Sequence, residues 1–133
     1  MKAFFDTFGF VAWANPSDPA HVAVGNWLSA YTGRFLTTEW ILMEYADALC
    51  SRKQRGTAVA FIDSLRLDAQ FEIVPYDTAI YQAGYDLFAA RPDKDWSLTD
   101  CISFVVMTRR GLTDALTGDQ HFEQAGFRAV FKI

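Results

Sequence analysis

Hydrophobic residues follow two different spacings along this chain, and their alternation predicts an α/β protein. Short apolar runs and period-two alternation predict strands at 2–5, 35–37, 71–75, 115–117 and 128–133, the last at a sheet edge. Apolar residues every three to four positions predict helices at 8–14, 21–31, 39–53, 57–67, 78–90 and 98–110, with a last helix running from Asp119 to a stop at Gly126. The alternation of strands and helices predicts a parallel sheet of about five strands, covered by helices on both faces.

Length and composition fit a single domain over residues 1–133. Of the 133 residues, 51% are hydrophobic and 21% charged, as in a globular protein with one buried core. No apolar run approaches the roughly 20 residues that cross a bilayer. The opening MKAFFDTFGF places an acid where a signal peptide is apolar, so we expect a cytoplasmic protein with no membrane contact. Cys50 and Cys101 fall in predicted helices, and we expect both to be buried free thiols.

The chain is acidic, with a formal net charge of −4 and a pI near 5. This balance argues against a protein that binds nucleic acid through a broad basic face. It does not exclude a nucleic-acid-binding protein whose acidic side chains are neutralised by bound divalent cations.

Three aspartates lie where a helix begins, two of them directly after a predicted strand. Asp6 follows the first strand, and Asp119 follows strand 115–117. Asp100 lies in the first turn of the helix that Ser97 is predicted to cap. Ligands of open α/β sheets bind outside the carboxyl ends of the strands, which makes these residues candidates for a site. Taken alone, each is more simply explained as a helix cap or a favourable first-turn charge.

A fourth acid, Glu44, is predicted to point inward from helix 39–53. It falls on one helical stripe with Ile41, Tyr45, Ala48 and Leu49. Burying a carboxylate costs several kcal/mol unless another group compensates its charge. Pairing with Arg or Lys and sharing a metal ion with other acids explain this residue equally well.

Asp6, Glu44, Asp100 and Asp119 come from four distant segments of the chain. In a right-handed α/β sheet their natural meeting point is the crevice where the strand order reverses. Four adjacent carboxylates cannot all stay ionised without a cation. Oxygen-only donors, with no Cys or His among them, suit Mg²⁺, with Mn²⁺ as the alternative. One or two such ions can activate water and stabilise charge on a phosphoryl group.

The motifs around these acids resemble those of PIN-domain nucleases, particularly the VapC-like toxins of toxin–antitoxin modules. The resemblance rests on Phe4-Phe5-Asp6-Thr7, Glu44 within TTEWILMEYADAL, Asp100 within WSLTDCISF and Asp119 within ALTGDQHFEQAGF. It covers essentially the whole chain. It implies a three-layer α/β/α sandwich with a central five-stranded parallel sheet. It also implies Mg²⁺- or Mn²⁺-dependent endoribonuclease cleavage that leaves a 5′-phosphate and a 3′-hydroxyl.

The same resemblance assigns roles to individual residues. Asp6, Glu44 and Asp100 match the central metal-binding acids, and Asp119 matches the fourth. Polar residues at supporting positions are Thr7, Ser97, Thr99 and Thr117. An RNA substrate, an antitoxin inserted near the acids and a homodimer are also implied. Basic residues that could steer the RNA backbone are Arg52, Lys53, Arg55 and Lys94.

Other functions must be weighed against this one. A PIN-like regulatory domain that binds RNA or protein without catalysis would share the fold. The presence of all four acids argues against a catalytically inactive site. A phosphoacceptor signalling domain would need an acidic pair after the first strand, where Asp6 stands alone. A phosphatase with an aspartyl nucleophile would need a second acid at the position of Phe8.

Overall fold

The computed structural model describes residues 2–132, which form an alternating series of strands and helices. In chain order the elements are β1 (Lys2–Phe5), α1 (Thr7–Ala14), α2 (His21–Ala30), β2 (Arg34–Thr38), α3 (Glu39–Ala48), α4 (Arg55–Leu67), β3 (Phe71–Val74), α5 (Thr78–Ala90), α6 (Leu98–Arg110), β4 (Asp114–Leu116), α7 (Gln120–Gln124) and β5 (Arg128–Ala129). No helix within residues 2–132 is long and apolar enough to cross a membrane.

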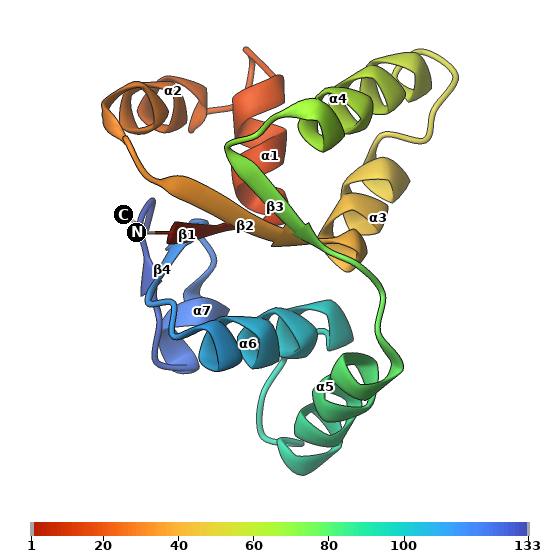
Figure 1. The fold of residues 1–133 in the computed structure, drawn as a ribbon, viewed down its shortest axis with the longest axis vertical. Helices are drawn as coiled ribbons and strands as arrows, with labels where there is room; N and C mark the ends of the chain where they lie inside the picture. The colour runs from red at the N-terminus through yellow and green to blue at the C-terminus, as the bar shows by residue number, and fades with distance from the viewer. Residues whose placement is uncertain (1, 133) are drawn as a thin grey trace.

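The strands form one five-stranded sheet in the order β3-β2-β1-β4-β5, with every neighbouring pair parallel. Helices α1 to α4 lie on one face of this sheet, and α5, α6 and α7 lie on the other (Figure 1). The predicted three-layer α/β/α sandwich is therefore confirmed. The two helical layers bury both faces of the sheet, as parallel sheets require.

The strand order reverses between β1 and β4. The chain moves outward from β1 to β2 and β3, then returns to the other side of β1 with β4 and β5. The register pairs Phe5 of β1 with Leu116 of β4, so the next residues, Asp6 and Thr117, leave the sheet side by side. This is the crevice in which open α/β sheets bind their ligands.

The aromatic residues of β1 anchor this end of the strand from both faces of the sheet. Phe4 and Phe5 are fully buried and, as neighbours in a strand, point to opposite faces. The Phe5 ring stacks on Phe10 of α1 with 4.3 Å between centroids, and Phe4 contacts Phe122 of α7 with 6.4 Å between centroids. Burial of each ring contributes about 1.5–3 kcal/mol, so the backbone that carries Asp6 is held firmly.

The helix predicted over 39–53 is wrong in its second half, because α3 ends at Ala48 and α4 begins only at Arg55. Cys50 lies in the intervening turn and is exposed, whereas Cys101 is buried as predicted, and both thiols are free. The Arg55 guanidinium donates hydrogen bonds to the Cys50 carbonyl oxygen. That contact stabilises the turn. The spacing of apolar residues, on which the helix prediction rests, does not reveal such a contact.

The last strand is also shorter than the predicted 128–133, since β5 ends at Ala129 and Ile133 lies outside the described residues. Its place at the edge of the sheet is confirmed. The backbone N–H groups of Val130 and Phe131 still donate to carbonyl oxygens of Ala115 and Thr117. The remaining element boundaries differ from the predicted ones by one or two residues, within the usual uncertainty of helix and strand ends.

Candidate active site

All four predicted acids line one open cavity of about 530 Å³ at the carboxyl end of the sheet. Asp6 follows β1, Glu44 comes from α3, Asp100 from α6, and Asp119 precedes α7. Distant parts of the sequence therefore meet where the strand order reverses, as predicted. The cavity also brings together Thr7, Phe8, Asp95, Ser97, Gly118 and His121.

Asp6 is the most buried of the four acids, with 6% of its surface exposed. It occupies the N-cap position of α1, but its side chain makes no capping hydrogen bond, so the simple capping explanation fails here. Its Oδ2 atom instead accepts a hydrogen bond of 2.8 Å from the buried Thr117 hydroxyl. Burial, with added repulsion from Asp100 and Glu44, raises the pKa of Asp6 from its usual 3.8 to about 7, despite the opposing Thr117 hydrogen bond.

Thr117 connects the acid after β1 with the acid before α7. While its hydroxyl donates to Asp6, its Oγ1 atom accepts the backbone N–H of Asp119 at 3.1 Å. Thr117 is fully buried, so water does not compete for these bonds. The supporting position predicted for Thr117 thus holds two of the acids in a fixed relation.

Glu44 is half-buried and faces the cavity, one position before the fully buried Tyr45 on α3. The Thr7 hydroxyl donates a hydrogen bond to Glu44 Oε1. Among residues 2–132, no lysine or arginine forms an ion pair with Glu44, Asp6, Asp100 or Asp119. Of the two explanations for Glu44, cation pairing through Arg or Lys is therefore excluded for the described residues.

Asp100 and Ser97 form a reciprocal capping box at the start of α6. The Ser97 hydroxyl accepts the Asp100 backbone N–H at 3.0 Å, and Asp100 Oδ2 accepts the Ser97 backbone N–H at 3.2 Å. Burial raises the pKa of Asp100, and the charge of Asp119 adds to this effect, while hydrogen bonds from Ser97 and His121 oppose it. Asp100 thus serves as the third residue of the helix in this capping box and as part of the cavity wall at the same time.

Thr99 does not lie in the acidic cavity. It lines a separate apolar groove between α3, α4, α5 and α6. Successive residues of a helix are rotated by about 100°, so Thr99 faces a different direction from Asp100. The structure therefore brings Thr7, Ser97 and Thr117 to the acids but leaves Thr99 apart from them.

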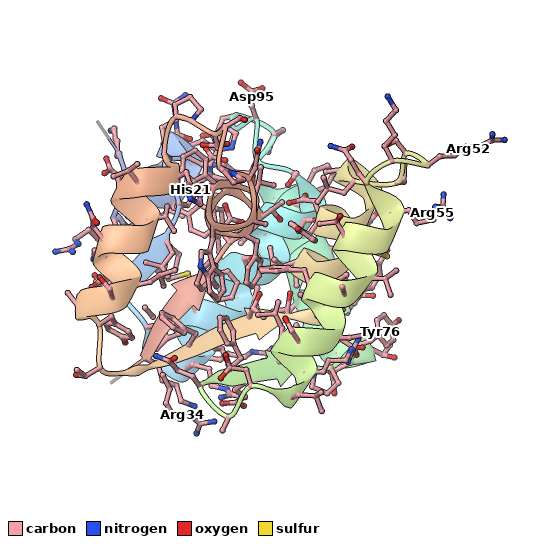
Figure 2. The ribbon with its side chains drawn as sticks, turned by 90° about the horizontal axis from the view of Figure 1, so that it is seen from above. His21, Arg34, Arg52, Arg55, Tyr76 and Asp95 are labelled. Carbon is pink, nitrogen blue, oxygen red and sulfur yellow. The ribbon has the colours of Figure 1, made fainter. Side chains whose placement is uncertain are left out.

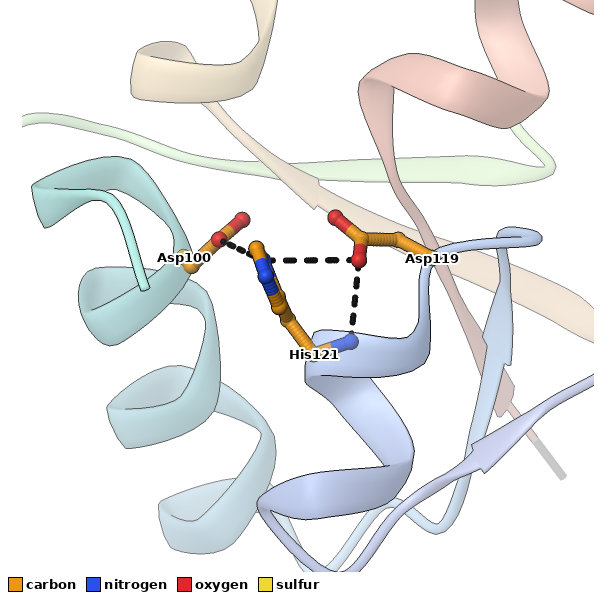
Figure 3. Close-up of side chains that lie close together, drawn as sticks. All are labelled: Asp100, Asp119 and His121. Carbon is orange, nitrogen blue, oxygen red and sulfur yellow. Dashed lines mark hydrogen bonds and ion pairs between the residues drawn. The ribbon is translucent and has the colours of Figure 1, made fainter. Parts of the chain in front are cut away.

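His121, which the sequence analysis did not single out, lies between two of the acids (Figure 3). Its Nδ1 atom is 3.1 Å from Asp100 Oδ2 and 3.4 Å from Asp119 Oδ1. Asp119 Oδ1 also accepts the His121 backbone N–H at 2.9 Å. In the sequence, the only sign of this arrangement is that His121 lies two residues after Asp119. The fold is what brings Asp100 next to Asp119 and His121.

The donor set fits a divalent cation. Four carboxylates with no neighbouring Lys or Arg partner among residues 2–132 leave negative charge uncompensated, and the raised pKa of Asp6 reports the cost. Ligand atoms of Asp100, Asp119 and His121 lie within 4.8 Å of one another, close enough for one ion. Carboxylate oxygens suit Mg²⁺ and Mn²⁺, and one imidazole is compatible with the latter.

Comparison with known proteins agrees with this architecture. The curated 23S rRNA-specific endonuclease VapC20 of Mycobacterium tuberculosis is 24% identical over 127 residues, 96% of both chains. The VapC20 crystal structure has a TM-score of 0.88 at 23% identity, covering 96% of this chain and 98% of that one. The crystal structure of FitAcB from Neisseria gonorrhoeae gives a TM-score of 0.70 at 20% identity, covering 97% of this chain and 96% of that one. Residues 3–128 match the PIN domain, and the chain therefore belongs to the PIN domain family.

Proposed function

We propose that this protein is a divalent-metal-dependent endoribonuclease and the toxin of a toxin–antitoxin pair. The observation that carries the proposal is the cavity formed by Asp6, Glu44, Asp100 and Asp119, which lies at the strand-order reversal. Within residues 2–132 no lysine or arginine lines this cavity. Membership of the PIN domain family supports it. VapC20, to which the chain is similar, is described as an endonuclease specific for 23S rRNA and as a toxin.

In this proposal the four acids hold one or two Mg²⁺ or Mn²⁺ ions. A bound ion of this kind activates water and neutralises charge on a phosphate group. Thr117 fixes the Asp6 carboxylate, Thr7 fixes Glu44, and the Ser97 backbone N–H orients Asp100. These neutral donors position the carboxylates without cancelling their charge, so the affinity for a cation is retained.

The proposed reaction is hydrolysis of an RNA phosphodiester. Water loses a proton as its oxygen bonds to phosphorus, the bond between phosphorus and the 3′ oxygen breaks, and the 3′ oxygen takes up a proton. The products carry a 5′-phosphate and a 3′-hydroxyl. Binding of a cation requires ionised carboxylates, and burial raises the pKa of Asp6 to about 7.

Basic side chains supply attraction for the RNA backbone. Arg52 and Arg55 project from the turn between α3 and α4 and from the start of α4 (Figure 2). Each phosphate contact from such residues adds salt-sensitive affinity. Because the whole chain carries a net charge of −4, we expect RNA binding to be weak without metal.

Two protein partners belong to the proposal. The first is an antitoxin, which the VapC-like motifs imply. The second is another copy of the chain, for which the open apolar groove of about 670 Å³ between α3, α4, α5 and α6 is the candidate surface. Met43 and Tyr76 on this groove are 58% and 60% exposed, and a homodimer would remove them from water. Light scattering of the purified protein tests this second partner directly.

The deciding experiment is cleavage of a mixed RNA pool by wild type in Mg²⁺ or Mn²⁺, by wild type in EDTA, and by Asp100→Asn in metal. We expect cleavage with 5′-phosphate ends only in the first condition. Calorimetric titration with Mn²⁺ accompanies the assay. If Mn²⁺ binds but every RNA in a broad pool stays intact, the result would favour a catalytically silent domain. If the RNA stays intact and no Mn²⁺ binds, the proposal is overturned.

A further inference from the structure

The geometry points to His121 as a direct nitrogen ligand of the divalent ion at Asp100 and Asp119, biasing this site toward Mn²⁺ over Mg²⁺. This inference rests on the proposed function for the presence of an ion, and it goes further by naming a fifth ligand and the preferred metal. The four acids expected to bind the ion are all carboxylates, and His121 is not among them. The argument depends on three side chains: Asp100, Asp119 and His121.

The spacing of the three ligand atoms matches that of neighbouring ligands around one ion. His121 Nδ1 is 3.1 Å from Asp100 Oδ2 and 3.4 Å from Asp119 Oδ1. In octahedral coordination with bonds of about 2.1 Å, adjacent ligand atoms are roughly 3 Å apart. The two distances from Nδ1 exceed this value by only a few tenths of an ångström, and ligand atoms of all three residues lie within 4.8 Å of one another, so side-chain rotations would bring them to one cation.

The His121 backbone holds the Asp119 carboxylate close to the imidazole. The His121 N–H donates to Asp119 Oδ1 at 2.9 Å, so this histidine and this aspartate form one local unit. The side chains of His121, Asp119 and Asp100 are 23%, 34% and 14% exposed. Such partial exposure leaves an open path for an ion and its waters, while the protein fixes the ligand atoms.

The nitrogen that faces the carboxylates is the one that would bind the ion. In the metal-free protein Nδ1 lies at hydrogen-bond distance, 3.1 Å, from Asp100 Oδ2. When the proton resides on Nε2 instead, the Nδ1 lone pair is free for a cation. Imidazole is a favourable ligand for Mn²⁺ and later transition ions, whereas Mg²⁺ prefers oxygen. One nitrogen in a carboxylate site therefore shifts the preference toward Mn²⁺.

Pulsed electron paramagnetic resonance of Mn²⁺-loaded protein tests this ligand without measuring activity. The chain has two histidines, so ¹⁴N coupling of the imidazole type can be assigned by substitution. His121→Asn keeps an N–H donor near the position of Nδ1 but removes the imidazole. His21→Asn is the matched control, because His21 on α2 contacts the Ala12 carbonyl oxygen and does not line the acidic cavity.

We expect imidazole ¹⁴N modulation in wild type and in His21→Asn, and its loss in His121→Asn. In calorimetry, His121→Asn should weaken Mn²⁺ binding about tenfold and Mg²⁺ binding much less, by analogy with other changes around metal ligands. If Mn²⁺ binds wild type without nitrogen coupling, His121 only bridges the two carboxylates and the inference is wrong. If no Mn²⁺ binds to wild type, the proposed four-acid metal site fails as well.

Discussion

Replacing Asp6 by Asn should stabilise the metal-free protein at alkaline pH and at the same time remove its nuclease activity. Asp6 is 6% exposed, and burial raises its pKa from 3.8 to about 7. The folded protein therefore resists ionisation of this group. Asn is similar in size, remains neutral at every pH, and can accept the same hydrogen bond from the Thr117 hydroxyl.

The size of the effect follows from linkage between protonation and folding. A rise in pKa of about 3, at roughly 1.4 kcal/mol for each pH unit, corresponds to a cost of about 4 kcal/mol for ionising Asp6 in the folded state. Below pH 3.8 both states are protonated and the cost is absent. As the pH rises toward 7, the unfolded chain loses the proton first, so stability falls, and above pH 7 the full cost applies.

Urea unfolding in EDTA measures this difference. The free energy of unfolding of Asp6→Asn should be close to that of wild type at pH 4 and should exceed it by up to about 4 kcal/mol at pH 8. Asp63→Asn, on the exposed side of α4, is the control for loss of one carboxylate outside the site. An advantage that does not grow between pH 4 and pH 8 would refute the reasoning. Saturating Mn²⁺ should shrink this advantage, because Asp6→Asn lacks one of the four proposed acids and gains less binding energy from the ion than wild type does.

Three further predictions concern the site and its support. Thr117→Val removes the donor to Asp6 and the acceptor for the Asp119 N–H. It should lower the free energy of unfolding by about 1–3 kcal/mol and shift the acidic limb of the cleavage–pH profile to higher pH. Thr117→Ser, which keeps the hydroxyl, should restore both properties. Below pH 7, Mn²⁺ affinity measured by calorimetry should rise up to about tenfold per pH unit, because Asp6 must lose its proton to bind. Gly84→Ala places a methyl group 2.4 Å from an Ile102 side-chain carbon and 3.0 Å from its Cα, so thermal unfolding should show a loss of about 1–3 kcal/mol, whereas Gly25→Ala has open space and should be neutral or stabilising.

The sheet and the four acids were predictable because each depends on a local pattern. A run such as Phe4-Phe5 identifies a buried strand, and the acid that follows must leave the sheet at its carboxyl end. The break after Ala48 was not predictable in this way, since it depends on the contact between Arg55 and the Cys50 carbonyl oxygen. Thr99 was misplaced because sequence proximity to Asp100 does not specify the side of the helix.

His121 escaped prediction for a related reason. Its significance comes from Asp100, which lies 21 residues earlier on a different helix, and the packing of α6 against α7 decides whether the two meet. Local helix and strand propensities cannot predict the distance between Asp100 and His121. The pattern GDQHF explains a helix start equally well, since Asp119 accepts the His121 backbone N–H in the manner of an N-cap.

The hydrogen bonds that hold the acids explain why this cavity suits a bound metal ion, where other proteins pair their acids with Arg or Lys side chains. Thr117, Thr7 and the Ser97 backbone each donate a neutral hydrogen bond to one acid. Such donors orient a carboxylate but leave its charge in place, whereas an Arg or Lys would cancel the charge and compete with an ion. Burial, with added repulsion from Asp100 and Glu44, thus keeps the pKa of Asp6 raised in the metal-free protein, and the charge of a bound divalent ion would oppose this effect. The buried Asp6 carboxylate lowers the stability of the metal-free protein at neutral and alkaline pH, which is why replacing Asp6 by Asn should stabilise the fold and remove function together.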